Sequence, residues 1–284
     1  MRRRPARPAN LLPAIAAVGL IALALGGCQT TASTETTGSL ASPPAARTDA
    51  DWRIEAETWG ARYRENPRNV QAAMRYAQAL RGIGQRTQAA AVLEQASIQN
   101  PHDRALLGAY GRALAEIGNY NQALEVLGRA HTPDQPDWRI LSAQGAVLDQ
   151  MGRHQEAQRY YASALKIMPD DPSVLSNLGL SYALMHDLPK AEETLRRAVA
   201  RPGADPRVRQ NLALVVGLEG RFAEAEKIAS ADLPPDEAAA NIAYLRQMVA
   251  RQSEPKKVSR RDPHPQPAGP QAAVPARTLT ASAD

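Results

Sequence analysis

The chain repeats itself every 34 residues, and this leaves few folds open to it. Glycines keep this step through the middle of the sequence, with His186 standing where the series skips one: Gly84, Gly118, Gly152 and Gly220. Alanines keep the same step at Ala89, Ala123, Ala157, Ala191 and Ala225. Such a period is typical of arrays in which each unit is a helix pair that must stack on its neighbours to bury its apolar side. The sequence therefore predicts an all-α solenoid of stacked antiparallel helix hairpins.

The residues that fill this period resemble the tetratricopeptide repeat, over about 170 residues in five units. Small residues occupy one position of every unit, and a large apolar residue follows sixteen positions later in the first four: Ala77, Gly111, Gly145, Gly179 and Ala213, against Leu93, Leu127, Tyr161 and Leu195. The resemblance implies a right-handed superhelix. We expect the small residues to let paired helices approach closely, and the large residue to fill the space toward the next unit.

The repeat array is expected over residues 51–251. Near its end Ala229 and Asp232 depart from the pattern, and residues 236–251 then read as one amphipathic helix that caps the array. Residues 52–65 look like the second half of a unit whose first helix is absent. Residues 252–284 are rich in proline and poor in large apolar side chains, which predicts a disordered tail, either inert or partner-binding.

The N-terminus reads as an export signal. Four arginines without an acid precede the twelve apolar residues 14–25, fewer than the roughly 20 that a membrane-spanning helix needs. Leu25, Gly26 and Gly27 before Cys28 resemble a bacterial lipobox, which implies cleavage after residue 27 and lipidation of Cys28. Gln29 is not aspartate, which by the same resemblance favours the outer membrane. A retained membrane anchor is the alternative, and residues 28–50 are expected to be a flexible linker.

Composition argues against an enzyme. Loss of residues 1–27 removes four arginines and no acid, so the formal net charge falls from +5 to +1, and no basic cluster in the array indicates nucleic acid. Cys28 is the one thiol. The five histidines lie at helix boundaries or in the tail, where we expect exposed turn residues without metal-ligand spacing: His102, His131, His154, His186 and His264. We expect no catalytic residues, cofactor, metal or small-molecule substrate.

Two acidic pairs and one glycine-rich stretch receive structural interpretations. Glu192 and Glu193 are assigned to a solvated helix face, and Asp170 and Asp171 to a helix-entry turn, where acids favour the helix dipole. The stretch "RGIGQR" at 81–86 lacks the third glycine and the preceding strand of a phosphate loop.

What remains is a surface for binding proteins. In the repeat pattern, one face of each first helix lines the concave side of the superhelix, where a mixed polar and apolar groove suits a peptide or a helix. We predict the protein-binding groove at Met74, Gln78, Arg81, Arg112, Ser142, Asp149, Asn177, Leu180, Arg207, Asn211 and Leu214. The wider set adds Gln71, Arg139, Ser176 and Gln210.

A second resemblance is more particular. The stretches "LSNLGLSYALMHDLPKAEETLRRAVARPGADPRVRQNLALVVGLEGRFAEAEKIA" and "AAANIAYLRQM", together with the lipobox, resemble the TadD-type lipoproteins of the tight-adherence (Flp) pilus assembly system. The resemblance implies a pilotin-like protein, lipid-anchored at the periplasmic face of the outer membrane, with the secretin or other pilus-assembly proteins as partners. The alternatives are a general cell-envelope adaptor unrelated to pili, and an enzyme or its regulatory subunit.

Overall fold

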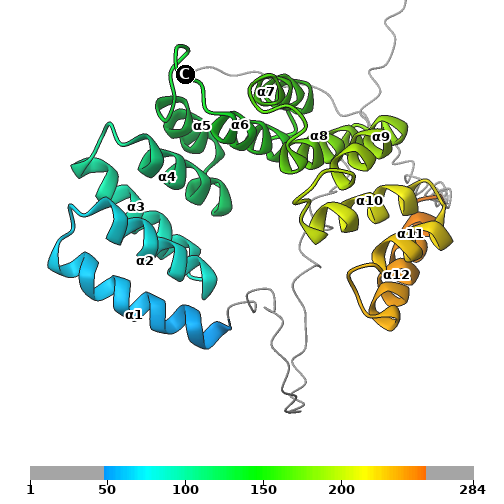
Figure 1. Ribbon diagram of the computed structural model, residues 1–284, viewed down its shortest axis with the longest axis horizontal. Helices are drawn as coiled ribbons and strands as arrows, with labels where there is room; N and C mark the ends of the chain where they lie inside the picture. Colours follow the sequence, from blue (N-terminus) through cyan, green and yellow to red (C-terminus); the bar gives the residue numbers. More distant parts are fainter. Residues whose placement is uncertain (1–47, 254–284) are drawn as a thin grey trace, which may run out of the picture.

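The computed structural model describes residues 48–253, which form twelve α-helices (Figure 1). They are α1 (Asp49–Glu65), α2 (Val70–Gly82), α3 (Arg86–Gln99), α4 (Arg104–Glu116), α5 (Tyr120–Arg129), α6 (Trp138–Gln150), α7 (His154–Ile167), α8 (Pro172–Leu184), α9 (Leu188–Val199), α10 (Pro206–Leu218), α11 (Phe222–Ala229) and α12 (Pro235–Ser253). This range contains no strand, only an isolated bridge between Thr132 and Gln135. The export signal, Cys28 and the tail from residue 254 lie outside the described residues.

The helices pair into five antiparallel hairpins, from α2/α3 to α10/α11, with α1 before and α12 after them. The array bends into an open arc with α1 and α12 at its two ends (Figure 1). The first helices α2, α4, α6, α8 and α10 each contact the next first helix, whereas the second helices contact mainly the first helices on either side. The first helices therefore line the inner, concave side, and the predicted all-α solenoid is confirmed.

Each first helix begins at a capping side chain, and these caps keep the 34-residue step: Asn69, Asp103, Asp137, Asp171 and Asp205. The carboxylate or amide oxygen of each cap accepts a hydrogen bond from a backbone N–H two or three residues later. Such a bond satisfies one of the N–H groups that a helix start leaves unpaired, at a gain of about 1 kcal/mol. The caps therefore start every hairpin at the same point of the repeat.

The small and large positions of the repeat meet inside each hairpin. A Cβ built on Gly111 would lie 2.6 Å from Cγ of Leu127, and one built on Gly179 would lie 2.7 Å from Cγ of Leu195. The large residue thus covers the small residue of its own hairpin, whereas the sequence interpretation directed it toward the next unit. The helices pack closely because the first helix presents no side chain at this point.

The turn inside each hairpin has one residue with a left-handed backbone. Gly84, Gly118, Gly152 and Gly220 have φ between 74° and 84°, as their spacing predicts. His186 takes the same conformation with φ of 61°, so the turn keeps its shape although a Cβ is present. The left-handed backbone conformation costs a residue with a Cβ about 1–2 kcal/mol.

Replacing His186 with glycine should therefore raise the free energy of unfolding by about 1 kcal/mol. The His186 side chain is exposed, so little packing is lost. Gly152→Ala is the matched reverse change, because a Cβ at Gly152 meets no atom within 4 Å and only the backbone conformation is penalised. Urea unfolding should show His186→Gly more stable than wild type and Gly152→Ala less stable. A His186→Gly variant no more stable than wild type would contradict a strained turn.

The C-terminal cap forms as predicted. Ala238, Ile242 and Leu245 of α12 are buried, and Met248 and Val249 on the same side are half-buried. Ile242 and Leu245 pack with Val215 and Val216 of α10 in one apolar cluster. The last hairpin therefore does not end on an open apolar face. Between residues 48 and 253, no helix is both long enough and apolar enough to cross a membrane.

Candidate protein-binding groove

The N-terminal half of the concave side is hollowed between α2 and α4. The hollow has a volume of about 330 Å³ and is lined by Gln71, Met74, Arg75, Ala77, Gln78, Arg81, Leu93, Ala109 and Arg112. The structure thus brings together the four predicted groove residues of the first two hairpins, Met74, Gln78, Arg81 and Arg112, with Gln71 of the wider set. Its lining mixes guanidinium and amide groups with small and apolar side chains.

The three arginines of the hollow differ in their partners. Arg81 donates from Nε to Oε2 of Glu116 at 2.7 Å and forms a second bond to the other carboxylate oxygen. Arg75 and Arg112 form no ion pair with any residue between 48 and 253. Both are exposed. The hollow therefore contains two guanidinium groups without an ion-pair partner among the described residues.

The surroundings of Arg112 in the hollow disfavour its positive charge. The surrounding protein reduces the hydration of its guanidinium, and the positive charge of Arg81 adds to this effect, so its pKa is lowered. Asp137 and Glu116 act in the opposite direction without reversing the shift. The side chain still has accessible surface, and a guanidinium stays protonated at neutral pH. An arriving anion would relieve this cost.

In the middle of the array Asp149 is bound internally instead of facing the groove. Its carboxylate accepts hydrogen bonds from the hydroxyls of Tyr161 at 2.9 Å and Ser181 at 2.8 Å, and lies 2.9 Å from Nδ1 of His154. Only 8% of the Asp149 side chain is exposed. We assign Asp149 a structural role that joins α6, α7 and α8, and it contributes no free carboxylate to the groove.

Two further pairs of predicted groove residues bond to each other. Asn177 donates from Nδ2 to Oγ of Ser142 at 3.2 Å, and Asn211 donates in the same way to Ser176 at 2.9 Å. Each bond joins one first helix to the next. The serines are buried and the asparagines are half-buried. These residues therefore link the helices of the concave side, and each asparagine keeps a carbonyl oxygen for which the described residues provide no donor.

The remaining predicted positions lie apart from the hollow. Leu180 and Leu214 are half-buried on α8 and α10. Arg207 is 85% exposed and pairs with Asp205 of its own helix start. Arg139 is exposed and lies over the ring of Trp138, with 4.3 Å from Cζ to the ring centroid. The predicted set therefore extends along the first helices beyond the hollow at the N-terminal end.

Sequence reasoning missed Arg75, which lines the hollow one residue after Met74. Arg75 precedes Asn177 and Asn211, two of the predicted groove residues, by three and four periods of 34 residues. It therefore occupies the same repeat position as they do, and this spacing was the available signal.

The histidines are less uniform than predicted. His102 and His186 are exposed, but His131 and His154 are half-buried and hydrogen-bonded, His131 through Nε2 to Gln144 at 3.2 Å. His131 lies against the next first helix, α6, and His154 lies against the preceding helix of its own hairpin, also α6, which sequence spacing does not reveal. Between residues 48 and 253, no three metal-ligating side chains come together. His264 lies outside this range.

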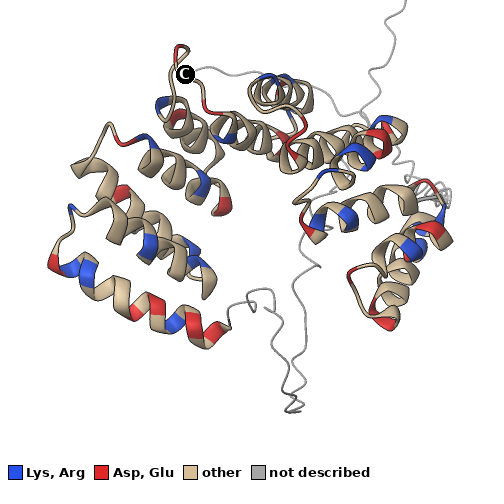
Figure 2. Ribbon diagram, viewed as in Figure 1, with Lys and Arg blue, Asp and Glu red and all other residues tan. Residues whose placement is uncertain are grey.

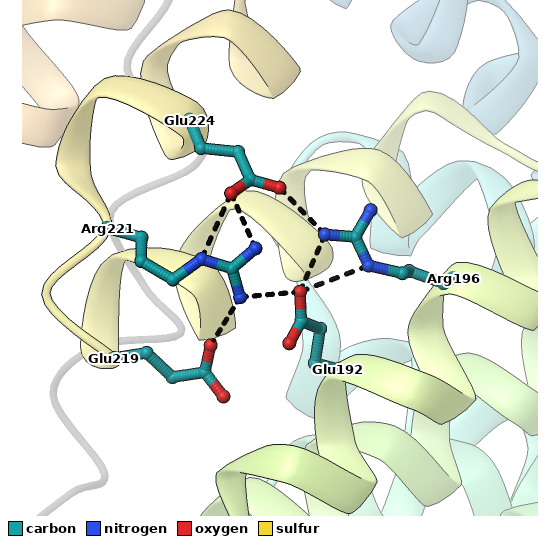
Figure 3. Close-up of polar contacts among 5 residues, drawn as sticks. All are labelled: Glu192, Arg196, Glu219, Arg221 and Glu224. Atoms are coloured by element: carbon teal, nitrogen blue, oxygen red, sulfur yellow. Dashed lines mark hydrogen bonds and ion pairs between the residues drawn. The ribbon is translucent and has the colours of Figure 1, made fainter.

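Charged groups in the C-terminal half pair with one another (Figure 3). Arg221 bonds through Nη1 to Glu192 at 2.8 Å and to Glu219 at 2.9 Å, and its Nε donates to Glu224 at 3.0 Å. Arg196 contacts Glu192 at 2.6 Å and Glu224 at 2.7 Å. Glu192 is only 17% exposed, so its assignment to a freely solvated face was wrong. The network ties α9 to the turn before α11.

Arg221→Gln should lower the melting temperature slightly at neutral pH. Burial raises the pKa of Glu192, but hydrogen bonds from Arg196 and Arg221 outweigh this and lower it below the usual 4.5. Hydrogen bonds from the same two arginines lower the pKa of Glu224. A carboxylate with a lowered pKa stabilises the fold above that pKa, and the contribution is lost as pH falls through it.

The difference in melting temperature between Arg221→Gln and wild type should therefore shrink as the pH falls below 4.5. It should also shrink at high salt, because the side chains of Arg196, Arg221 and Glu224 are accessible to solvent. Arg86→Gln is the control, since Arg86 is exposed and forms no ion pair among the described residues. A difference that stays constant with pH would show that the network contributes nothing through its charges.

The comparisons with known proteins agree with this architecture. Two family models, each described as a tetratricopeptide repeat, match residues 83–145 and 139–202. A comparison with curated protein sequences gave no match.

Several solved structures are similar. PilW, described as a widely conserved type IV pilus biogenesis factor, gives a TM-score of 0.58 at 17% identity, over 68% of this chain and 91% of that chain. TTC0263, a tetratricopeptide protein of Thermus thermophilus, gives 0.53 at 26% identity, over 64% and 97%. A chain of the APC/C hetero-tetramer Cut9-Hcn1 gives 0.55 at 15% identity, over 70% and 40%. These likenesses show that the chain contains tetratricopeptide repeats and has their solenoid fold.

Proposed function

We propose that this tetratricopeptide-repeat protein is a lipid-anchored scaffold of the outer membrane that assists assembly of a Flp/tight-adherence pilus. In this role it acts like a pilotin and grips the secretin, or a neighbouring assembly protein, in its concave groove. The observation that carries the binding role is the hollow between α2 and α4, where Arg75 and Arg112 lack an ion-pair partner among the described residues. Tetratricopeptide arrays are scaffolds for protein interaction, and this surface is the part of the array equipped for it.

Two observations support the pilus assignment. Residues 175–229 resemble TadD-type lipoproteins, and PilW, which is described as a pilus biogenesis factor, has the same fold over most of its length. The resemblance of residues 25–27 to a lipobox supports the anchor at Cys28. A lipid at Cys28 would keep the groove at the membrane where a secretin assembles, which raises the effective concentration of one for the other.

The test is Cys28→Ser in the organism that makes the protein. We expect the variant to fractionate as a soluble periplasmic protein or to remain an unprocessed precursor, and surface pili to be lost. The repeats contain no cysteine, so they should fold as in wild type, which circular dichroism would check. The control replaces the export signal and Cys28 with those of an unrelated outer-membrane lipoprotein, which should restore pili.

Normal pili with the soluble variant would contradict the role of the anchor. Normal pili in a strain that lacks the protein altogether would contradict the pilus assignment. It would then favour the general envelope adaptor, since the groove and the repeats would keep their binding role.

A further inference from the structure

The first helices, which line the concave side, carry a net positive charge. The five of them contain seven arginines, no lysine and two acids. Both acids are already engaged, Glu116 with Arg81 and Asp149 with Tyr161, Ser181 and His154. Figure 2 shows basic residues on α2 and α4, two of the helices that line the concave side. No carboxylate of these helices is therefore left to neutralise the hollow.

The arginines of the first helices that lack a partner lie together in the hollow between α2 and α4. Among the seven arginines, Arg209 pairs with Asp232, Arg207 with Asp205 and Arg81 with Glu116. Arg104 bonds to Gln135, and Arg139 stacks on Trp138. Arg75 and Arg112 are the two for which the described residues supply no carboxylate, no other hydrogen-bond acceptor and no aromatic ring, and both line the same hollow.

The other lining residues favour a peptide over a nucleic acid as the ligand of the hollow. Met74, Ala77 and Leu93 give the hollow an apolar floor that can take an apolar side chain. Proteins that hold single-stranded nucleic acid combine positive charge with aromatic side chains on which bases stack, and the lining of this hollow contains none. An alternation of acidic and apolar side chains fits the lining better than a phosphate backbone does.

We propose that the segment held in this groove is an acidic peptide of the partner protein, with an aspartate or glutamate carboxylate on Arg112, a second on Arg75, and an apolar side chain between them against Met74. This inference rests on the proposed function, because it names the chemistry of the segment that the scaffold grips. Arg112 gains most, since a carboxylate would offset both its reduced hydration and its repulsion by Arg81.

The test uses the full-length purified protein and two fluorescent peptides, one of alternating leucine and glutamate and one with glutamine in place of glutamate. Fluorescence anisotropy should show binding of the glutamate peptide only, weakening as salt rises. Arg112→Gln should weaken binding about tenfold, the effect of losing one charge-assisted hydrogen-bonded pair. Arg129→Gln is the control, because Arg129 is exposed on the second helix α5 and does not line the hollow, and it should bind as wild type does.

Three results would overturn the inference: equal binding of the glutamine peptide, no effect of Arg112→Gln, or competition by a single-stranded oligonucleotide as strong as that by the glutamate peptide. Absence of binding to either peptide would count against it as well. None of these results touches the proposed function, which fails separately if the protein is dispensable for pili. Charge reversal completes the test, because Arg112→Glu should bind a peptide of alternating leucine and lysine that wild type rejects.

Discussion

Gly145→Val is expected to destabilise the array by about 3 kcal/mol, the upper part of the usual range for overpacking. A Cβ at Gly145 would lie 2.6 Å from Cε1 of Tyr161 and under 3.0 Å from two more atoms of its ring. The ring has no room to withdraw, since Tyr161 is 1% exposed and its hydroxyl is held by Asp149 at 2.9 Å. Helices α6 and α7 must therefore separate, and the middle of the array would lose its packing.

Urea unfolding followed by circular dichroism would measure this loss. The matched control is Gly128→Val in α5, where a built Cβ meets only the amide of Gln144 at 4.0 Å. Both changes put the same side chain into a helix, so their difference isolates the contact with Tyr161. If Gly145→Val and Gly128→Val unfolded at the same urea concentration, the close approach of α6 and α7 would be refuted.

Asp149→Ala should cost a similar amount, about 3 kcal/mol, through unsatisfied hydroxyl groups. The change removes the acceptor of two buried donors, the hydroxyls of Tyr161 and Ser181, and the partner of His154. Burial, followed by the charge of Asp149, raises the pKa of Tyr161, so this hydroxyl keeps its proton and needs an acceptor. A buried donor without an acceptor loses the bond and still pays for its lost hydration.

The combination of Asp149→Ala with Tyr161→Phe and Ser181→Ala separates this cause from loss of packing. It removes the stranded donors, so we expect it to recover part of the lost stability in spite of its two extra substitutions. Thermal unfolding of the single and triple variants would measure the recovery. A triple variant less stable than Asp149→Ala would show that the cost lies elsewhere.

The sequence predicted those features that depend on position within the repeat. The turn conformation at Gly84 and at His186 follows from chain geometry a few residues long, so a spacing of 34 located it. The face of each first helix follows from the helical period, so Met74, Gln78, Arg81 and Arg112 could be placed together before the structure was known. The 34-residue repeat therefore suffices to predict both the fold and the approximate position of the groove.

Contacts between side chains of different helices could not be predicted in this way. Asp149 satisfies every positional criterion for the concave face, yet residues 12 and 32 positions further along the chain take up its oxygens. Glu192 looks like one acid of an exposed pair until Arg221, in the next hairpin, is seen beside it. In each case the partner residue occurs in one unit and is not repeated in the others, so the repeat pattern could not predict the contact.

Site-specific photo-crosslinking in intact cells would show whether the partner lies on the concave side of the array. A photoreactive residue at Gln78 would report on the hollow, and residues at Glu125 and Glu193, exposed on the second helices α5 and α9, would report on the outer side. We expect crosslinks from position 78 to a pilus-assembly protein, abolished by Arg112→Glu, and none from positions 125 and 193. Crosslinks from the outer positions with none from position 78 would contradict this placement of the partner.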